Sequence, residues 1–180
     1  MSGDQPGFVL WFTGLSGAGK TTIAVALEPE LKKRGVKVER LDGDIVRESL
    51  TRDLGFSKED RDKNIERVTF VAKLLSRNGV GVLASFISPY QKTRDMVRSQ
   101  TTNFVEVYVH VTLDEAIERD VKGMYKKALA GEIKNFTGVS DPYEAPEDPE
   151  ITVDTTGQEL EESVAHVISE LEKLGLIPTA

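Results

Sequence analysis

Residues 14–22 read Gly14-Leu15-Ser16-Gly17-Ala18-Gly19-Lys20-Thr21-Thr22, and they directly follow the apolar run Phe8-Val9-Leu10-Trp11-Phe12-Thr13. A glycine, four residues and then Gly-Lys-Thr is the spacing of a phosphate-binding loop (P-loop) between a strand and a helix. The glycines let backbone N–H groups point at phosphate oxygens, Lys20 reaches the β- and γ-phosphates, and the Thr21 hydroxyl meets Mg²⁺. A helix beginning near Gly19 adds the positive end of its dipole to this pocket. The stretch predicts that the chain binds a nucleoside triphosphate, and it leaves the reaction open.

The composition is that of one compact domain. The chain has 180 residues, 39% of them hydrophobic, and no repeat or linker divides it, so we expect a single domain over 1–180. The absence of cysteine excludes disulfides and thiolate metal sites. No apolar stretch approaches a membrane span and residues 1–7 are too short and polar for a signal peptide, so we expect a cytoplasmic protein without a membrane partner. A net charge of −7 argues against nucleic acid, although local Lys and Arg residues can still bind a small anion.

Strand and helix patterns alternate along the whole chain. We expect strands at 8–13, 36–42, 80–87, 104–111 and 150–153. We expect helices at 19–34, 44–51, 58–78, 90–101, 113–130 and 159–173, the third capped by Ser57 with Asp60 as an approximate capping-box partner. Several of the strands are near-continuous apolar runs, which suits burial on both faces of a parallel sheet. The pattern predicts an α/β fold, a three-layer α/β/α sandwich of the P-loop NTPase type with a mainly parallel five-stranded sheet.

Residues 131–149 depart from this alternation. The segment is rich in glycine, proline and charge, and it carries Phe136 close to Lys134. A loop of this length in a compact domain is usually either a mobile lid or disorder. We interpret it as a lid that closes over bound substrates and excludes water.

Two carboxylates follow the second expected strand, in Leu41-Asp42-Gly43-Asp44. Ligands of parallel sheets bind beyond the carboxyl ends of the strands, so this pair is placed to hold Mg²⁺-bound water and to orient or deprotonate a hydroxyl. The alternative for Asp44 is a helix N-cap. The third expected strand ends in Ser85-Phe86-Ile87-Ser88 without an acid, so Asp42 is the best second ligand for Mg²⁺ beside Thr21.

Arg61 and Ser88 are the two remaining candidates from the residue pattern. Arg61 continues the apolar stripe of the 58–78 helix, with Asn64 adjoining, and a buried arginine needs an anion. That anion is either a substrate or a structural carboxylate, and helix geometry does not choose between them. Ser88 is either a nucleophile that carries a phosphoryl group or a plain substrate contact, and the lack of an adjacent base favours the contact.

Together these segments resemble the adenylylsulfate kinase (APS kinase) family, which transfers the γ-phosphate of ATP to the 3′-hydroxyl of adenosine 5′-phosphosulfate (APS). The resemblance covers nearly the whole chain in the right order. It is carried by residues 14–22; Leu41-Asp42-Gly43-Asp44 with Arg47; Leu54-Gly55-Phe56-Ser57 with Asp60-Arg61 and Asn64; Ser85-Phe86-Ile87-Ser88-Pro89-Tyr90; Arg119-Asp120-Val121-Lys122-Gly123-Met124-Tyr125-Lys126-Lys127-Ala128; and Gly131-Glu132-Ile133-Lys134-Asn135-Phe136-Thr137-Gly138 through Asp141-Pro142-Tyr143-Glu144. The last two motifs are the most specific.

The resemblance implies a role for each matching position. ATP would be bound by Gly14, Leu15, Ser16, Gly17, Ala18, Gly19, Lys20, Thr21 and Thr22, and Mg²⁺ by Thr21 and Asp42. The APS contacts would be Asp44, Arg47, Phe56, Arg61, Asn64, Ile87, Ser88, Lys122, Asn135 and Phe136. Within that set, Phe56 and Phe136 would sandwich adenine, Arg61 and Asn64 would contact the phosphosulfate, and Asp44 would orient the 3′-hydroxyl. The catalytic positions would be Lys20, Asp44 and Ser88, the last sometimes assigned a phosphoserine intermediate; we favour direct in-line transfer to 3′-phosphoadenylylsulfate (PAPS).

The resemblance also has departures and implied partners. Ile45, Met124 and Asn135 differ from the usual family residues without removing a charged group, which affects affinity rather than activity. Many stand-alone bacterial members have proline where this chain has Val121, and in this respect the chain resembles the members that are fused to ATP sulfurylase. Fusion to or association with that enzyme is therefore expected. A homodimer is also expected, because family members commonly form one.

Three alternatives to an APS kinase make distinct demands on the sequence. Another small-molecule P-loop kinase should lack the Phe56 and Phe136 pair and the Lys122-Gly123 segment. A non-catalytic nucleotide-binding module would be favoured by loss of Lys20, Asp44 or the lid, all of which are present. A GTPase would need an Asn-Lys-x-Asp segment, which the sequence does not contain.

Overall fold

A five-stranded sheet forms the centre of the molecule. The computed structural model describes residues 5–179, so part of the N-terminal stretch 1–7 and of the proposed 1–180 domain lies outside the described residues. The strands are β1 (Phe8–Thr13), β2 (Val38–Asp42), β3 (Gly81–Ser85), β4 (Phe104–His110) and β5 (Ile151–Asp154). Their order is β2-β3-β1-β4-β5, and every pairing is parallel. This confirms the predicted α/β class and the five strands.

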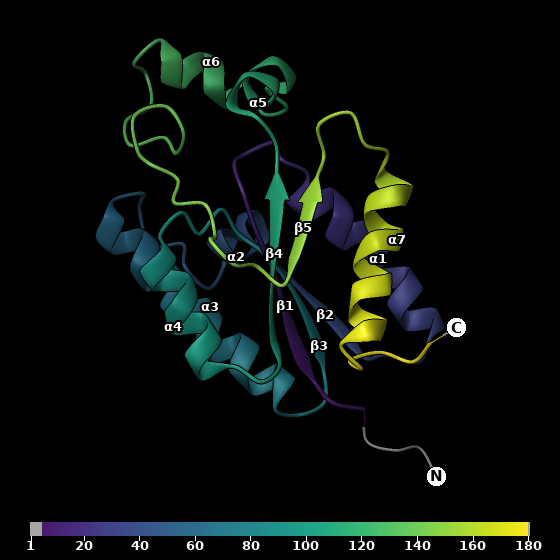
Figure 1. Ribbon diagram of the computed structural model, residues 1–180. Helices are drawn as coiled ribbons and strands as arrows, with labels where there is room; N and C mark the ends of the chain where they lie inside the picture. Colours follow the sequence, from purple (N-terminus) through teal and green to yellow (C-terminus); the bar gives the residue numbers. More distant parts are fainter. Residues whose placement is uncertain (1–4, 180) are drawn as a thin grey trace.

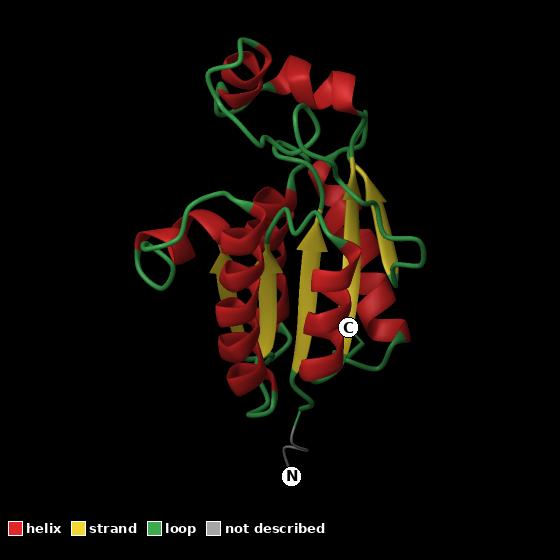
Figure 2. Cartoon of the chain, turned by 90° about the vertical axis from the view of Figure 1, so that its left-hand side faces the viewer, coloured by secondary structure: helices red, strands yellow, loops and turns green. Residues whose placement is uncertain are grey.

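Helices cover both faces of the sheet, as Figures 1 and 2 show. On one face lie α1 (Lys20–Lys33) and α7 (Leu160–Lys173), and on the other lie α3 (Lys58–Ser76) and α4 (Gln91–Gln100). The shorter helices are α2 (Gly43–Glu48), α5 (Leu113–Arg119) and α6 (Met124–Leu129). Within residues 5–179, none of the helices has both the length and the apolar character needed to cross a membrane.

Strand β1 shows why the apolar runs could be recognised as central strands. All six of its residues are buried. Phe8, Leu10 and Phe12 belong to the core that includes α1 and α7, whereas Val9 and Trp11 belong to the core that includes α3 and α4. Because side chains alternate between the two faces of a strand, both faces of β1 must be apolar.

The expected single helix over 113–130 is wrong, because the chain breaks it into α5 and α6. The backbone turns left-handed at Asp120 (φ 26°) and at Gly123 (φ 66°). The Asp120 carboxylate then accepts the N–H groups of Tyr125 (2.9 Å) and Lys126 (3.1 Å), so it satisfies donors at the start of α6. The break places the turn 120–123 above the sheet edge, where it reaches the residues that follow β2.

The start of α3 is capped as predicted, although only half of the capping box forms. The Ser57 hydroxyl accepts the Asp60 N–H at 3.1 Å. The Asp60 carboxylate accepts the Gly55 N–H at 3.0 Å instead of returning to Ser57. Asp60 therefore orders the loop that carries Phe56, in addition to the helix start.

The strand register brings the carboxyl ends of the strands to one edge. Ser85 pairs with both Phe12 and Asp42, and Thr13 pairs with Tyr108. In Figure 2 the connecting loops and the two short helices α5 and α6 lie above the tips of the strand arrows. The predicted site segments at the carboxyl ends of β1, β2 and β3, which are residues 14–22, 42–44 and 86–88, therefore border this edge.

Candidate active site

The loop between β1 and α1 has the backbone of a phosphate-binding loop. Gly17 (φ 77°) and Gly19 (φ 105°) occupy the left-handed region that favours glycine. A Cβ atom at Gly14 would lie 2.4 Å from the Val109 carbonyl oxygen, so only glycine fits this close approach to β4. Lys20 is the first residue of α1, and its Nζ donates to the carbonyl oxygens of Gly14 (2.8 Å) and Leu15 (2.7 Å).

The ammonium group of Lys20 lies in a pocket that disfavours its charge. Burial and, to a lesser degree, the charge of Lys122 lower the pKa of Lys20 to about 7, although the carboxylates of Asp42 and Asp44 act in the opposite direction. Polyphosphate oxygens placed against Lys20 would favour the charged form. The loop thus contains a desolvated cation whose natural partner is an anion.

Three side chains that the sequence did not single out as site residues support the loop from outside. The Tyr125 hydroxyl donates to the Ser16 carbonyl (2.8 Å), and the Thr155 hydroxyl donates to the Ala18 carbonyl (2.7 Å). Arg119 donates to the Gly17 carbonyl (3.4 Å) and to the Thr155 carbonyl (2.7 Å). These bonds use carbonyl oxygens, so they fix the loop without occupying N–H groups that phosphate oxygens require. Thr155 follows β5 directly, and Arg119 and Tyr125 lie in the 119–128 motif of the family resemblance, so these positions were the signals in the sequence.

Asp42 connects the phosphate-binding loop to the end of β2. Its Oδ2 accepts the Thr21 hydroxyl at 2.5 Å, and its Oδ1 accepts the Asp44 N–H at 3.0 Å as the N-cap of α2. The alternative that Asp44 caps this helix is therefore wrong, because helix α2 begins one residue before Asp44 and Asp42 caps it. Asp44 remains free of the helix end and projects from its first turn.

Thr21 and Asp42 fit a magnesium site of the P-loop kind. Mg²⁺ prefers oxygen ligands, and it usually combines one or two protein groups with phosphates and water. Within the described residues there is no cluster of three or more His, Cys, Asp or Glu side chains that could hold a metal by themselves. A hydroxyl and a carboxylate in contact beside the phosphate-binding loop are the donor set that remains.

Asp44 and Lys122 meet across the sheet edge. Lys122 lies in the turn between α5 and α6, and its Nζ donates to Asp44 Oδ2. Both side chains are more than half exposed, at 57% for Lys122 and 71% for Asp44. The structure therefore brings together two predicted site residues that are 78 positions apart.

Phe56 and Phe136 lie in different surroundings. Phe56 is 61% exposed, and the Arg47 guanidinium carbon lies 4.3 Å from the centre of its ring. Phe136 is buried, with its ring edge-on to Tyr125 at 5.0 Å between centroids. Among residues 5–179 no aromatic contact joins Phe56 to Phe136. The adenine sandwich implied by the resemblance stays a prediction.

Arg61 has its anion in this structure, and that anion is a carboxylate of the expected lid. Arg61 Nη1 donates to Asp141 Oδ2 (3.0 Å) and to the Thr137 hydroxyl (2.9 Å), and Nη2 donates to the Asn135 carbonyl. The adjoining Asn64 is buried and accepts the Thr51 hydroxyl at 2.7 Å. The structural alternative for Arg61 is thus observed, and contact with a substrate anion stays a prediction.

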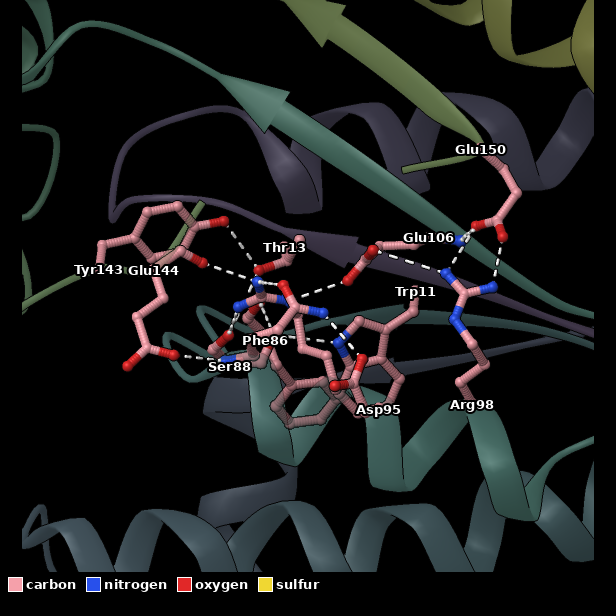
Figure 3. Close-up of polar contacts among 12 residues, drawn as sticks. Trp11, Thr13, Phe86, Ser88, Asp95, Arg98, Glu106, Tyr143, Glu144 and Glu150 are labelled. Atoms are coloured by element: carbon pink, nitrogen blue, oxygen red, sulfur yellow. Dashed lines mark hydrogen bonds and ion pairs between the residues drawn. The ribbon is translucent and has the colours of Figure 1, made fainter. Parts of the chain in front are cut away.

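Ser88 is buried in the polar cluster of Figure 3. Its hydroxyl accepts the Trp11 indole N–H (3.0 Å) and donates to the Phe86 carbonyl (3.2 Å). Its backbone is left-handed, with φ 40°. The neighbouring Ile87 carbonyl accepts the Thr13 hydroxyl at 2.7 Å, and that hydroxyl also contacts the Tyr143 hydroxyl at 2.9 Å. The hydroxyl that was a candidate nucleophile is therefore occupied as donor and as acceptor.

Known proteins resemble this chain in sequence and in structure. The family model for adenylylsulphate kinase matches residues 6–154. A probable adenylyl-sulfate kinase from Pseudomonas aeruginosa is 74% identical over 92% of this chain and 77% of that protein. A probable bifunctional SAT/APS kinase from Sorangium cellulosum is 58% identical over 96% of this chain, which spans 30% of that protein.

The fold comparison agrees with the sequence comparison. The structure of the Mycobacterium tuberculosis APS kinase CysC in complex with AMPPNP and APS matches with a TM-score of 0.89 and 40% identity. The match covers 93% of this chain and 98% of that one. The family model spans most of the chain, and the two bacterial relatives are 74% and 58% identical to it. The chain belongs to the adenylylsulfate kinase family.

Proposed function

We propose that this adenylyl-sulfate kinase transfers the γ-phosphate of ATP to the 3′-hydroxyl of APS, giving PAPS and ADP for sulfate assimilation. The reaction would take place at the edge of the sheet where the strands end. The observation that carries the proposal is a single set of contacts at the sheet edge. Thr21 of the phosphate-binding loop meets Asp42, Asp42 caps the helix that carries Asp44, and Asp44 meets Lys122. Consecutive hydrogen bonds therefore connect the phosphate site to an exposed carboxylate that can orient a hydroxyl.

The donor side of the site consists of residues 14–22. Their backbone N–H groups and Lys20 would bind the phosphates of ATP, and the buried ammonium would neutralise charge that builds on the γ-phosphate. Thr21 and Asp42 would hold Mg²⁺, which would supply further neutralisation of the phosphate charge when it is bound.

Asp44 is the proposed base on the acceptor side. It would accept the proton of the 3′-hydroxyl while that oxygen forms its bond to the γ-phosphorus and the bond from that phosphorus to the ADP oxygen breaks. Lys122 would orient the carboxylate and balance its charge. The buried Ser88 hydroxyl, already bonded to Trp11 and Phe86, supports direct transfer without a phosphoserine.

The remaining predicted positions would bind APS. The proposed contacts are Arg47, Phe56, Arg61, Asn64, Ile87, Ser88, Lys122, Asn135 and Phe136. Residues 131–149 would act as the lid, because Arg61 already ties Asn135, Thr137 and Asp141 to α3. A closed lid would exclude water, which otherwise competes with the 3′-hydroxyl for the phosphoryl group.

The same proposal includes the organisation of the protein. We propose a single kinase domain over 1–180, a homodimer and a cytoplasmic location. We also propose fusion to or association with ATP sulfurylase, which the bifunctional relative from Sorangium cellulosum supports.

A coupled ADP-release assay tests the activity. ATP and Mg²⁺ are held constant while APS, AMP or adenosine is supplied as acceptor, and hydrolysis without any acceptor is subtracted. We expect turnover with APS and background rates with AMP and adenosine. Equal rates with AMP, or no APS-dependent ADP release, would refute the proposal.

A further inference from the structure

Arg94 of α4 is one of the largest fully buried side chains in the molecule, at 1% exposed. Its guanidinium donates to four acceptors: Glu106 Oε1 at 2.8 Å, the Ser88 carbonyl at 2.7 Å, the Gln91 side-chain oxygen at 2.7 Å and the Glu144 carbonyl at 2.6 Å. A buried arginine is costly unless its charge is paired and its donors are satisfied. Glu106 of β4, itself 3% exposed, supplies the paired charge.

Two of these acceptors are backbone carbonyls from different loops of the active-site edge. Ser88 follows β3 and adjoins the proposed APS contact Ile87, whereas Glu144 lies near the carboxyl end of the lid. Figure 3 shows Ser88 and Glu144 close together. A planar fork of five N–H donors can bridge two such carbonyls, and a lysine cannot reproduce that geometry.

Further bonds tie the same two loops together. The Glu144 N–H donates to the Pro89 carbonyl at 2.8 Å, and the Glu144 carboxylate accepts the Gln91 N–H at 2.7 Å. Residues 88–91 and the lid end therefore form one joint, with Arg94 at its buried centre. The left-handed backbone of Ser88 is an uncommon conformation that surrounding contacts must maintain.

The side chains that hold the carbonyl groups of the ATP loop are Arg119, Tyr125 and Thr155, and within residues 5–179 none of these three bonds to Arg94. The joint reaches the residue before the loop through Thr13, whose hydroxyl donates to the Ile87 carbonyl and contacts the Tyr143 hydroxyl. A disturbance at Arg94 should therefore reach the proposed APS contacts and the lid before it reaches the phosphate-binding loop.

We propose that Arg94, balanced by Glu106, is a positioning residue that fixes the Ser88 segment and the lid end relative to each other for APS binding. The inference rests on the proposed function, because it assigns Ile87, Ser88 and the lid to the APS side. A side chain of purely structural value would affect both substrates alike.

The test compares Arg94→Lys with Arg98→Lys. Arg98 lies one turn along α4 and also pairs with Glu106, but it contacts neither Ser88 nor Glu144. For Arg94→Lys we expect kcat/KM for APS to fall by about tenfold or more, with KM for ATP within about twofold. For Arg98→Lys we expect both constants to stay within about twofold. Equal effects of the two variants, or an equal loss for ATP and APS in Arg94→Lys, would overturn the proposal.

Amide hydrogen exchange gives a second readout that needs no turnover. In Arg94→Lys, exchange should accelerate at residues 86–90 and 142–145 and stay unchanged in 14–22; unchanged exchange at the joint would overturn the inference.

If Arg94→Lys does not fold, Glu144→Ala weakens the same joint by removing an exposed carboxylate. It should raise KM for APS by about threefold, with KM for ATP unchanged. An unchanged KM for APS would count against the joint. Lack of APS-dependent turnover in the unsubstituted protein would refute the proposed function instead.

Discussion

Asp42 and Asp44 are separated by one glycine and have different tasks. Asp42 is buried, caps α2 and accepts the Thr21 hydroxyl, so both of its oxygens are engaged. Asp44 is exposed, and within residues 5–179 its carboxylate has one bonded partner, Lys122 in the turn 120–123. A carboxylate that is exposed at the mouth of the site can meet a substrate hydroxyl, whereas a buried carboxylate with both oxygens engaged is suited to hold the phosphate-binding loop and, as proposed, Mg²⁺.

We therefore expect Asp44→Ala to separate binding from catalysis. Loss of the proposed general base should lower kcat by about a hundredfold or more, while the dissociation constant for ATP stays within about twofold. Steady-state kinetics and calorimetric titration of an ATP analogue measure the two quantities. Glu48→Ala, an exposed change on the same helix α2, is the matched control. Normal turnover in Asp44→Ala would remove the residue from the mechanism.

Ser88→Ala tests whether the buried hydroxyl is chemical or structural. The change leaves the Trp11 indole N–H without its acceptor, which should cost about 1–3 kcal/mol of unfolding free energy. The backbone carbonyl that binds Arg94 remains, so we expect kcat within about fivefold of the unsubstituted value. Urea unfolding and the coupled assay report the two effects. A loss of several orders of magnitude in kcat would instead support a phosphoserine.

Among the helices and strands, the break between α5 and α6 has the largest consequence for the site. A continuous helix over 113–130 was the expectation, since the segment has helical composition. The break lets Lys122 reach Asp44 and Tyr125 reach Ser16, so the departure from regular structure creates two contacts at the site. Sequence periodicity could not reveal it, because Asp120 stabilises the turn through two N–H groups that follow it.

Gly123→Ala measures the value of this break. No atom lies within 4 Å of the added Cβ, so the cost comes from the left-handed backbone and should be about 1–2 kcal/mol of unfolding free energy. The strain favours a continuous helix and withdraws Lys122 from Asp44, so kcat/KM for APS should fall by about tenfold. Gly35→Ala is the control, because it lies outside the proposed site, its φ is 79° and its Cβ also meets no atom within 4 Å. A similar kinetic loss in both variants would show strain alone to be responsible.

The fold could be predicted from the sequence more fully than the site could. Strands such as β1 are apolar on both faces, so the local pattern already identifies central strands of a parallel sheet. Residues 14–22 and the carboxylates after β2 are likewise local motifs. Arg94, Tyr125 and Thr155 bond to backbone carbonyls that lie as far as 50, 109 and 137 positions away. No local pattern identifies such partners, because the fold alone brings them together.

The layers of the molecule are joined by a polar bridge that should make stability depend on pH. Arg98 of α4 pairs with Glu150, which precedes β5, and Glu150 Oε2 accepts the Glu106 N–H of β4 at 2.5 Å. Burial alone would raise the pKa of Glu150, but the bonds from Arg98 and from the Glu106 N–H outweigh it, and the pKa falls below its ordinary value of 4.5. A carboxyl group with a lowered pKa in the folded state stabilises the fold above the unfolded pKa and loses that effect as the pH falls through the folded pKa.

Glu150→Gln should therefore lower the unfolding free energy at pH 7, and its deficit should shrink as the pH falls from about 4.5 through the folded pKa. Glu106 cannot account for this trend, because burial raises the pKa of Glu106. Its pH-dependent contribution to the unfolding free energy therefore has the opposite sign. The measurement is urea unfolding of both proteins from pH 7 down to the lowest pH at which they remain folded. Glu147→Gln removes an exposed acid from the same segment and should leave stability unchanged throughout. A Glu150→Gln deficit that stays constant or grows on acidification would mean that the bridge does not depend on the charge of Glu150.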